Sequence, residues 1–300
     1  MRARVLVTGG SGFIGRSLVP ALAEHFEVTA PPRTALDLLD ADAVLGYLER
    51  GGYDVVVHAA TWDATSTSCK DPARVLENNL RMFHSVARAR TSFGRLVHLG
   101  SGAEYDRGRE LLGVREEEFD DAVPADQYGF SKYLVRKHCE ASPGVVTLSL
   151  FGVFGPYEDW RLRFLSNACC HALLGLPVEV GRDALFDYVS VDDVAAAVAW
   201  CVANEPSRRS YNVCRGEAVS LLDLARAVIE VAGSDAGLVV HREGRGPSYS
   251  GDPSRFAQES GWRPGGLRGQ IEALYAWYEQ HRDEIDPAML RGRAWLRTEA

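Results

Sequence analysis

A glycine-rich turn near the start of the chain constrains the fold more than any other feature of the sequence. The stretch TGGSGFIG (8–15) directly follows the apolar run RVLVT (4–8) and opens a helical pattern that extends to about residue 25. Gly9 permits a tight turn, Gly12 lets the backbone approach a pyrophosphate, and Gly15 allows the helix to pack closely on the strand. The amino end of the helix, with Phe13 and Ile14, would supply N–H groups and the positive end of the helix dipole. The order of strand, turn and helix therefore favours a dinucleotide site over a purely structural turn.

Short apolar runs alternate with longer helical patterns through the first half of the chain. We predict strands at 4–8, 26–30, 54–58, 95–99 and 145–150, and helices at about 13–25, 41–50, 73–91 and 127–142. The runs are rich in β-branched residues and apolar on both faces, which is typical of strands covered on both sides. The pattern therefore predicts an α/β fold with a doubly wound parallel sheet of the Rossmann type.

The regularity weakens after residue 151, which predicts a smaller, mixed α/β lobe for the substrate, laid over the carboxyl edge of the sheet. We predict short strands at 178–180, 187–191, 211–213 and 238–241, and helices at 161–174, 192–204, 220–232 and 267–281. The third of these helices begins with a capping box at Ser220 and Asp223. The cofactor-binding domain is expected to comprise 1–151 and about 185–207, the substrate lobe about 152–184 and 208–285, and a C-terminal tail 286–300.

The composition narrows the possible partners. The formal net charge is −8 and the pI is about 5.5, which argues against binding of nucleic acid or a membrane surface, because both would repel an acidic protein. The chain runs into an apolar strand without a leader pattern, and no later run approaches the ~18 apolar residues of a membrane span, so we expect a cytoplasmic protein. The six cysteines contain no CxxC pair, so we expect reduced thiols and predict no metal site.

The end of the second strand indicates which dinucleotide is bound. The stretch TAPPRTALDLLD carries Arg33 and no acid before Asp37. An acid at this place would accept hydrogen bonds from a ribose 2′-hydroxyl, whereas an arginine would meet a 2′-phosphate. The sequence therefore favours NADP(H) over NAD(H). The alternative is that Arg33 is an exposed loop charge, the usual fate of arginine.

The stretch YGFSK (128–132) places a phenol and an ammonium one helical turn apart, on the same face of the helix after the fourth strand. Alone, Tyr128 and Lys132 could equally be a solvated surface pair. A phenol is a weak acid at neutral pH, but a nearby ammonium and a positive nicotinamide favour its ionised form. Tyr128 could then exchange a proton with a hydroxyl or carbonyl while hydride passes to or from the cofactor. Ser101, at the carboxyl end of the fourth strand, is placed to hydrogen-bond the same oxygen.

The order of many short motifs along the chain resembles that of a known enzyme family. TGGSGFIG, DLLD, HAAT, ENNL, GSGAEY, YGFSK, FGVFGP, YVSVDDVA, YNV and ESGWRP are similar to the landmarks of the extended short-chain dehydrogenase/reductases, the NAD(P)-dependent sugar-nucleotide epimerase/dehydratase family. The resemblance covers residue 3 to about residue 281. It implies an enzyme of nucleotide-linked sugars that forms a homodimer through the helices after strands three and four.

The resemblance also implies roles for individual residues. Ser101, Tyr128 and Lys132 would form the catalytic triad. The further cofactor contacts would be Asp37 and Leu38 at the adenine, Ala59, Ala60 and Thr61 along the cofactor, Asn79 on the nicotinamide side, and Phe151. The substrate contacts would be Ser101, Gly102, Ala103, Tyr128, Asn167, Val180, Arg182 and Arg255.

Departures from the family's patterns narrow the reaction. In the dehydratases of this family, the segment after the fourth strand contains the pattern Thr-Asp-Glu. The matching positions of this chain are Ser101, Gly102 and Ala103. GDP-fucose synthase-like 4-ketoreductases, which the chain resembles in LDLLD and LGS, also epimerise, with a cysteine at the position of Ala103 and a histidine near that of Arg163. Without these groups we expect neither dehydration nor two-base epimerisation, so simple ketone reduction remains.

Other departures concern the substrate. Relatives carry Asn at the position of Gly152 and Arg at that of Phe186, so recognition of a pyrophosphate is expected to fall to other cations. The candidates are Arg163, Arg182 and Arg255, any of which could equally be solvated. Three histidines in apolar surroundings are expected to have satisfied structural roles: His58, His98 and His171.

The leading hypothesis is an NADPH-dependent reductase of the keto group, C4 by preference, of a nucleotide-linked 4-keto-6-deoxysugar. One alternative is a C4 epimerase that retains NAD and returns the hydride to the other face of the sugar. A third, from a different class, is an NADP-sensing binding protein on a reductase fold. Such proteins commonly lack the Tyr or the Lys, and both are present here.

Overall fold

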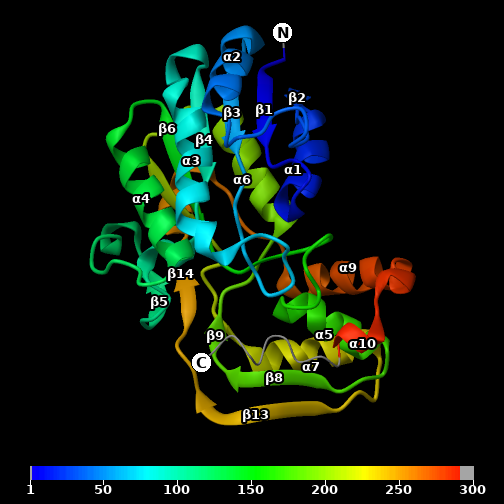
Figure 1. Ribbon diagram of the computed structural model, residues 1–300. Helices are drawn as coiled ribbons and strands as arrows, with labels where there is room; N and C mark the ends of the chain where they lie inside the picture. Colours follow the sequence, from blue (N-terminus) through cyan, green and yellow to red (C-terminus); the bar gives the residue numbers. More distant parts are fainter. Residues whose placement is uncertain (1, 291–300) are drawn as a thin grey trace.

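A six-stranded parallel sheet forms the centre of the computed structural model, which describes residues 2–290 (Figure 1). Its order is β11–β6–β4–β3–β1–β2, and every neighbouring pair is parallel. The strands are β1 (Arg4–Thr8), β2 (Glu27–Thr29), β3 (Val55–His58), β4 (Arg95–Leu99), β6 (Val145–Leu150) and β11 (Ser210–Val213). The predicted doubly wound parallel sheet is confirmed. Because β2 and β3 lie on opposite sides of β1, the chain opens a crevice at the carboxyl ends of β1 and β3.

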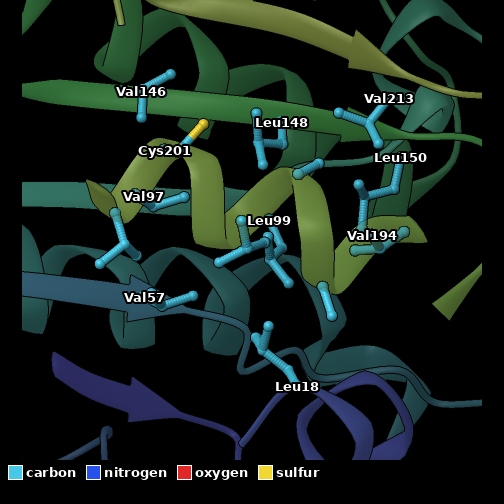
Figure 2. Close-up of a cluster of buried hydrophobic side chains, with 14 of the residues drawn as sticks. Leu18, Val57, Val97, Leu99, Val146, Leu148, Leu150, Val194, Cys201 and Val213 are labelled. Atoms are coloured by element: carbon cyan, nitrogen blue, oxygen red, sulfur yellow. The ribbon is translucent and has the colours of Figure 1, made fainter. Parts of the chain in front are cut away.

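Helices cover both faces of this sheet, as the apolar strands require. The five helices are α1 (Phe13–Ala23) and α6 (Val191–Ala203) on one face, and α2 (Ala41–Gly51), α3 (Val75–Arg88) and α4 (Gln127–Ala141) on the other. Figure 2 shows α6 lying over the strands and running roughly along them, with Cys201 and Val194 in the same buried cluster as Val97, Leu99 and Leu148. Full burial of each such Leu or Val stabilises the fold by about 1.5–3 kcal/mol.

The smaller lobe has its own hydrophobic core and lies below the carboxyl ends of the sheet in Figure 1. Its helices are α5 (Phe164–Leu173), α7 (Leu221–Ala232), α9 (Leu267–Gln280) and α10 (Pro287–Leu290). A strand pair, β8 (Val178–Asp183) with β13 (Leu238–Arg245), packs against α7. The predicted mixed α/β lobe is therefore present. At the start of α7, the Ser220 hydroxyl accepts hydrogen bonds from the N–H groups of Leu222 and Asp223, which is one half of the predicted capping box. The Asp223 carboxylate accepts instead from the Arg226 guanidinium at 2.7 Å.

Two small sheets connect the lobe to the main sheet. One has the order β12 (Val219–Ser220), β9 (Leu185–Phe186), β14 (Tyr249–Gly251), β5 (Leu111–Val114), and the other pairs β7 (Val153–Phe154) with β10 (Val189–Ser190). The predicted strand at 187–191 is thus shortened to β10. Single 3₁₀ turns occur at Pro72–Arg74, Arg90–Ser92, Gly102–Tyr105, Glu116–Glu118 and Arg282–Glu284. The sequence did not predict β5, β7 or β14, because two to four residues are too few to show a period.

The domain boundary predicted at residue 208 is corrected in two places. β11 pairs with β6 and so forms an edge of the main sheet, whereas its place in the sequence predicts that it belongs to the lobe. The short helix α8 (Ser254–Ser260) follows it, because Phe256 is buried in the same core cluster as α6 and β11. The four-residue pattern SYNV is compatible with a strand of the main sheet or of the lobe. Only its pairing with β6 shows that it belongs to the main sheet.

The predicted C-terminal tail is also corrected over its first residues. Residues 287–290 form α10, and Leu290 is buried in the lobe core. The remainder of that prediction, 291–300, lies outside the described residues. Within residues 2–290, no helix is both long enough and apolar enough to cross a membrane.

Candidate active site

A cavity of about 1190 Å³ lies between the carboxyl ends of the main strands and the lobe. Its floor includes Thr8 at the end of β1, Ala59 after β3 and Ser101 after β4. Residues outside the main sheet, such as Arg182 of β8 and Tyr249 of β14, also line the cavity. The cavity therefore occupies the crevice where doubly wound folds bind ligands.

The glycine turn forms one end of this cavity and has the geometry that the sequence predicts. Gly9 has φ +74°, and a Cβ atom there would lie 2.7 Å from the Ala60 backbone. A Cβ atom on Gly15 would lie 2.2 Å from the Gly9 carbonyl oxygen, so only glycine lets α1 pack this closely on the turn. Gly12, Phe13 and Ile14 line the cavity.

The amino end of α1 fits a bound pyrophosphate. Gly12 is the N-cap residue, and within the described chain no side chain caps this helix and no acid lies in its first turn. The first N–H groups of a helix have no partner inside the helix and attract anions. A Cβ atom on Gly12 would meet only the Gly9 carbonyl oxygen, at 3.3 Å, so the backbone is open to a ligand. The residues present therefore fit the diphosphate of a dinucleotide.

The expected adenine end is formed by the segment after β2. Arg33, Asp37 and Leu38 all line the cavity. The Arg33 guanidinium lies 3.3 Å from the Asp37 carboxylate, and its side chain is 62% exposed. It also lies 5.6 Å from the centre of the Trp62 ring. Arg33 is thus held at the cavity with most of its surface free for a ligand.

The segment after β3 forms the wall between these two ends. Ala59, Ala60 and Thr61 line the cavity as predicted, whereas Asn79 does not. The Asn79 side chain accepts hydrogen bonds from the Trp62 N–H at 2.7 Å and the Thr61 hydroxyl at 3.3 Å. Asn79 therefore holds this segment in place from behind.

The structure brings the three predicted catalytic residues together. Ser101 and Tyr128 both line the cavity. Lys132 lies behind them, 5% exposed, with its ammonium 5.8 Å from the centre of the Tyr128 ring. That ammonium donates a hydrogen bond of 2.9 Å to the Leu99 carbonyl at the end of β4. The Ser101 hydroxyl accepts a hydrogen bond of 3.2 Å from the Ala103 N–H.

A buried ion pair fixes the two elements that carry these residues. Arg136 lies one further turn along α4 from Lys132, is fully buried, and pairs with the fully buried Glu104 at 2.9 Å. Glu104 belongs to the 3₁₀ turn that begins after Ser101. Burial raises the pKa of Glu104, and the positive charge of Arg136 opposes this most strongly. The pair therefore ties α4 to the turn that presents Ser101.

His58, His98 and His171 differ in the hydrogen bonds that their ring nitrogens form. His58 bonds the Thr8 hydroxyl at 2.9 Å, and burial with the nearby Lys132 lowers its pKa to about 3. His171 bonds the Pro177 carbonyl through one ring nitrogen. His98 contradicts the prediction, because neither ring nitrogen has a hydrogen-bond partner among residues 2–290. Its ring packs instead against the His58 and Phe83 rings, at 5.6 and 5.3 Å between centres.

On the substrate side, the structure places some predicted residues at the cavity and others away from it. Arg182 lines the cavity, as do Arg163, Gly152 and Phe186. The predicted substrate contacts Gly102 and Ala103, and the predicted cofactor contact Phe151, are buried and do not line the cavity.

Three further predicted substrate contacts, Val180, Asn167 and Arg255, are corrected. Val180 is buried in the core of the lobe, whereas Gly181 and Arg182 line the cavity. The Asn167 amide donates to the Trp160 carbonyl at 3.0 Å. Arg255 lies at β11, where it pairs with Glu117 and donates to the Ser210 carbonyl at 3.1 Å. The positions of these side chains depend on which face of an element is buried, and the short patterns of the lobe do not show this.

Several cavity residues could not be recognised in the sequence. They are Trp62, Lys70, Arg107, Glu158, Tyr188 and Tyr249. Each belongs to an irregular segment or a two- to three-residue strand, and a single sequence gives no signal for them. Within residues 2–290, no group of three or more His, Cys, Asp or Glu side chains is arranged to hold a metal ion.

Most of the chain is similar to one protein family and to a known reductase. The model of the NAD dependent epimerase/dehydratase family matches residues 5–214. GDP-6-deoxy-D-mannose reductase of Pseudomonas aeruginosa is 26% identical over 307 residues, which cover 95% of this chain and 100% of that protein. These matches include the glycine turn, Ser101 and Tyr128.

Two solved structures resemble the whole fold. RMD from Pseudomonas aeruginosa, solved with NADPH, is 26% identical, has a TM-score of 0.81, and covers 94% of this chain and 99% of its own. UDP-glucose 4-epimerase from Thermus thermophilus, solved with NAD, is 28% identical, has a TM-score of 0.77, and covers 92% of this chain and 99% of its own. The similar proteins thus include a reductase and an epimerase.

Proposed function

Because the chain belongs to the NAD dependent epimerase/dehydratase family, as its motifs predict, it is an NAD(P)-dependent enzyme, and we propose that it reduces a nucleotide-linked 4-keto-6-deoxysugar at C4. The cofactor in this proposal is NADPH. The similarity to a GDP-6-deoxy-D-mannose reductase supports a reduction, and the similarity to a 4-epimerase supports chemistry at C4.

The observation that carries this proposal is the absence of space for an acid beside Ser101. A Cβ atom on Gly102 would lie 2.4 Å from the Phe151 ring and 2.6 Å from the Tyr249 hydroxyl. A carboxylate at this position, as dehydratases of the family carry, would collide with both. This supports ketone reduction over dehydration, with Tyr128, which lines the cavity, as the proposed proton donor.

The roles of the catalytic residues follow from their geometry. NADPH, when bound, supplies the hydride. Tyr128 donates a proton to the carbonyl oxygen of the substrate, and the Ser101 hydroxyl hydrogen-bonds that oxygen as negative charge develops. Lys132, fixed by the Leu99 carbonyl, stabilises the negative charge left on Tyr128.

Arg33 supports NADPH as the cofactor rather than NADH. It lies at the end of the cavity expected to hold the adenine, and its guanidinium is largely exposed. A guanidinium can donate two parallel hydrogen bonds to a 2′-phosphate. The NADPH complex of the similar RMD structure agrees with this choice.

Arginines on the lobe side support a substrate that carries a diphosphate. Arg163 and Arg182 both line the cavity, on segments from the lobe. Guanidinium groups are suited to the pyrophosphate of a nucleotide sugar. With the nucleotide held there, the sugar would extend towards Ser101 and Tyr128.

The direct test is reduction of a panel of nucleotide-linked 4-ketosugars, followed by the absorbance of NADPH. We expect at least one ketosugar to be reduced and Tyr128→Phe to lower kcat by about 100- to 10,000-fold, because the proton donor is lost. The matched control is Tyr133→Phe on the same helix, whose hydroxyl donates to Asp120 at 2.9 Å outside the cavity. Retention of activity within a few-fold by Tyr128→Phe would show that its assigned role is wrong.

A C4 epimerase remains the second candidate, since the chain is similar to a 4-epimerase solved with NAD. An epimerase returns the hydride to the sugar and needs no added cofactor. Incubation with nucleotide sugars alone therefore separates the two functions. Interconversion of 4-epimers without NADPH would favour the epimerase, whereas consumption of NADPH by a ketosugar would favour the reductase.

A further inference from the structure

We propose that the Glu158 carboxylate binds a hydroxyl group of the nucleotide-linked sugar and so helps to determine which sugar the enzyme accepts. This inference rests on the proposed function for the class of ligand, and it adds a specificity-determining residue to the site. Glu158 lies between β7 and α5, in the segment that follows Pro156.

Glu158 is a buried acid in the wall of the cavity. The residue lines the cavity although it is only 6% exposed. The Ser166 hydroxyl of α5 donates a hydrogen bond of 2.5 Å to one carboxylate oxygen, Oε2. Within residues 2–290, Glu158 forms no ion pair, and its other oxygen, Oε1, has no hydrogen-bond partner but is not fully enclosed. Oε1 is therefore the atom that is open to the cavity.

The carboxylate lacks the partners that a buried charge normally has. Burial raises the pKa of Glu158 to about 7, and the hydrogen bond from Ser166 and the charge of Arg163 oppose this rise only in part. A buried acid in a cavity with a raised pKa is typical of functional sites. A hydrogen-bond donor supplied by the ligand would complete the set of partners.

The backbone that carries Glu158 is strained. The preceding residue, Tyr157, has φ +69°, in the left-handed region that a bulky side chain rarely adopts. Such a conformation costs free energy and persists only where the surrounding structure holds it. Strained residues of this kind cluster at ligand sites, so the strain at Tyr157 is a second observation that supports a role for Glu158.

Contacts on both sides of the acid hold this conformation. The Arg16 guanidinium of α1 lies 3.9 Å from the centre of the Tyr157 ring, and the Trp277 ring of α9 packs at 5.3 Å between ring centres. On the other side, the Thr67 hydroxyl donates a hydrogen bond of 2.5 Å to the Asp159 carboxylate. These anchors come from both the cofactor domain and the lobe. The acid is thus held in place before a ligand binds, which lowers the entropic cost of binding.

The charges around Glu158 favour a hydroxyl group over a cationic group as its ligand. Arg163 is near enough to affect the pKa of Glu158, and it lines the same cavity. The ammonium group of an amino sugar would be repelled by that charge. A hydroxyl donates a short, charge-assisted hydrogen bond to a carboxylate. A nucleotide-linked sugar has such hydroxyls on its hexose ring and on its ribose, and the test separates these two sources.

The test is calorimetric binding of a nucleotide-linked 6-deoxyhexose, which needs no turnover, to the wild-type enzyme and to Glu158→Met. Methionine is similar in length and removes both oxygens. The affinity should fall by about 10- to 100-fold, because a hydrogen bond to a charged group is lost. Glu158→Gln keeps the shape and loses the charge, so it should weaken binding by about 5- to 10-fold.

Deoxy analogues identify the hydroxyl that Glu158 binds. The wild type should bind the parent sugar more tightly than at least one analogue, the 2-deoxy or 3-deoxy hexose or the 2′-deoxynucleotide form. Glu158→Met should bind that analogue and the parent with nearly equal affinity, because the two changes remove the same interaction. The analogue that shows this coupling assigns the hydroxyl to the hexose or to the ribose.

Stability measurements separate binding from a purely structural role. Thermal unfolding at about pH 8 should show that Glu158→Met is at least as stable as the wild type, because an uncompensated buried charge is removed. Weaker binding by a variant that is no less stable is a result that a structural role does not produce. The control is Glu179→Met, which removes a lobe carboxylate that pairs with His241 at 2.9 Å outside the cavity and should leave the affinity unchanged.

The outcomes distinguish this inference from the proposed function. A wild-type enzyme that binds the nucleotide-linked sugar but reduces no ketosugar overturns the proposed function alone, whereas one that binds no nucleotide-linked sugar overturns both. Unchanged affinity of Glu158→Met for the sugar, or an equal loss for the parent and for every deoxy analogue, overturns this inference alone. Tighter binding of an amino sugar than of the parent by the wild type, but not by Glu158→Met, also overturns it.

Discussion

Replacement of Arg136 by methionine tests whether the buried ion pair behind the catalytic turn holds the site together. Tyr128, Lys132 and Arg136 follow one another at single-turn spacing on α4, and Arg136 is fully buried. Its guanidinium donates to Glu104 at 2.9 Å, to Glu140 at 3.0 Å and to the Glu116 carbonyl at 3.1 Å. Methionine fills a similar volume but leaves Glu104 buried without its cation.

The expected loss of stability is large. Removal of one partner of a buried ion pair costs about 3–5 kcal/mol, because the other charge stays buried and uncompensated. Unfolding entropy of about 2 cal/mol/K per residue gives roughly 0.6 kcal/mol/K for this chain, so the melting temperature should fall by about 5–8 °C. Arg81→Met is the matched control, since Arg81 forms an exposed pair with Glu77 and its removal should leave the melting temperature nearly unchanged.

The loss should also depend on pH. Burial already raises the pKa of Glu104 against the opposing charge of Arg136, and removal of that charge should raise it further. A group whose pKa is higher in the folded state contributes stability at low pH that is lost as pH rises. The deficit of Arg136→Met relative to wild type should therefore be smaller at about pH 5 than at about pH 8, as measured by scanning fluorimetry.

Addition of Glu104→Gln to Arg136→Met should recover at least half of the lost stability, because a neutral amide no longer needs a cation. Two results would refute the reasoning. One is a melting temperature for Arg136→Met within about 2 °C of wild type. The other is a double variant that is no more stable than Arg136→Met alone.

Two further predictions concern residues of the cavity. Arg33→Ser should weaken NADPH binding by about 10- to 100-fold, because a charge-assisted hydrogen bond to a 2′-phosphate contributes about 1.5–3 kcal/mol. NADH binding should change by no more than a few-fold, and calorimetry with both cofactors measures the two affinities. The control is Arg88→Ser, which removes an exposed arginine that is paired with Asp42. Burial raises the pKa of Glu158 to about 7, despite a hydrogen bond from Ser166. This carboxyl therefore contributes stability at low pH that is lost as pH rises to about 7. Glu158→Gln should be more stable than wild type at about pH 8, by up to about 3 kcal/mol. Thermal unfolding across pH measures this difference, and a variant whose stability depends on pH as the wild type's does would contradict the prediction.

The main sheet and the cofactor end of the site were predictable because each rests on a local pattern. The strands are continuous apolar runs, and Gly9 and Gly15 have positions where a Cβ atom would collide with backbone. Tyr128 and Lys132 were predictable together because a helix fixes the geometry of residues four apart. These patterns need no knowledge of distant contacts.

The lobe side of the site was less predictable because it depends on long-range pairing. The Tyr249 hydroxyl lies beside Gly102 because β14 pairs with β9 and β5. Arg255 lies away from the cavity because it pairs with Glu117 near β11. The surroundings of the His98 ring, whose nitrogens have no partner among residues 2–290, likewise depend on neighbours from two other elements, β3 and α3. The homodimer through α3 and α4 and the cytoplasmic location stay predictions, because a single chain contains neither a partner nor a compartment.

The return of the chain to the main sheet at β11 and α8 limits how the enzyme can be re-engineered. The lobe is assembled from separate stretches before and after these elements, and β5 reaches it from the first half of the chain. The lobe does not correspond to one continuous segment of the chain. Transfer of the lobe to a relative, or its deletion as one segment, would therefore also remove β11 from the edge of the main sheet. A change of sugar preference must therefore be introduced side chain by side chain along the wall that faces the nicotinamide site.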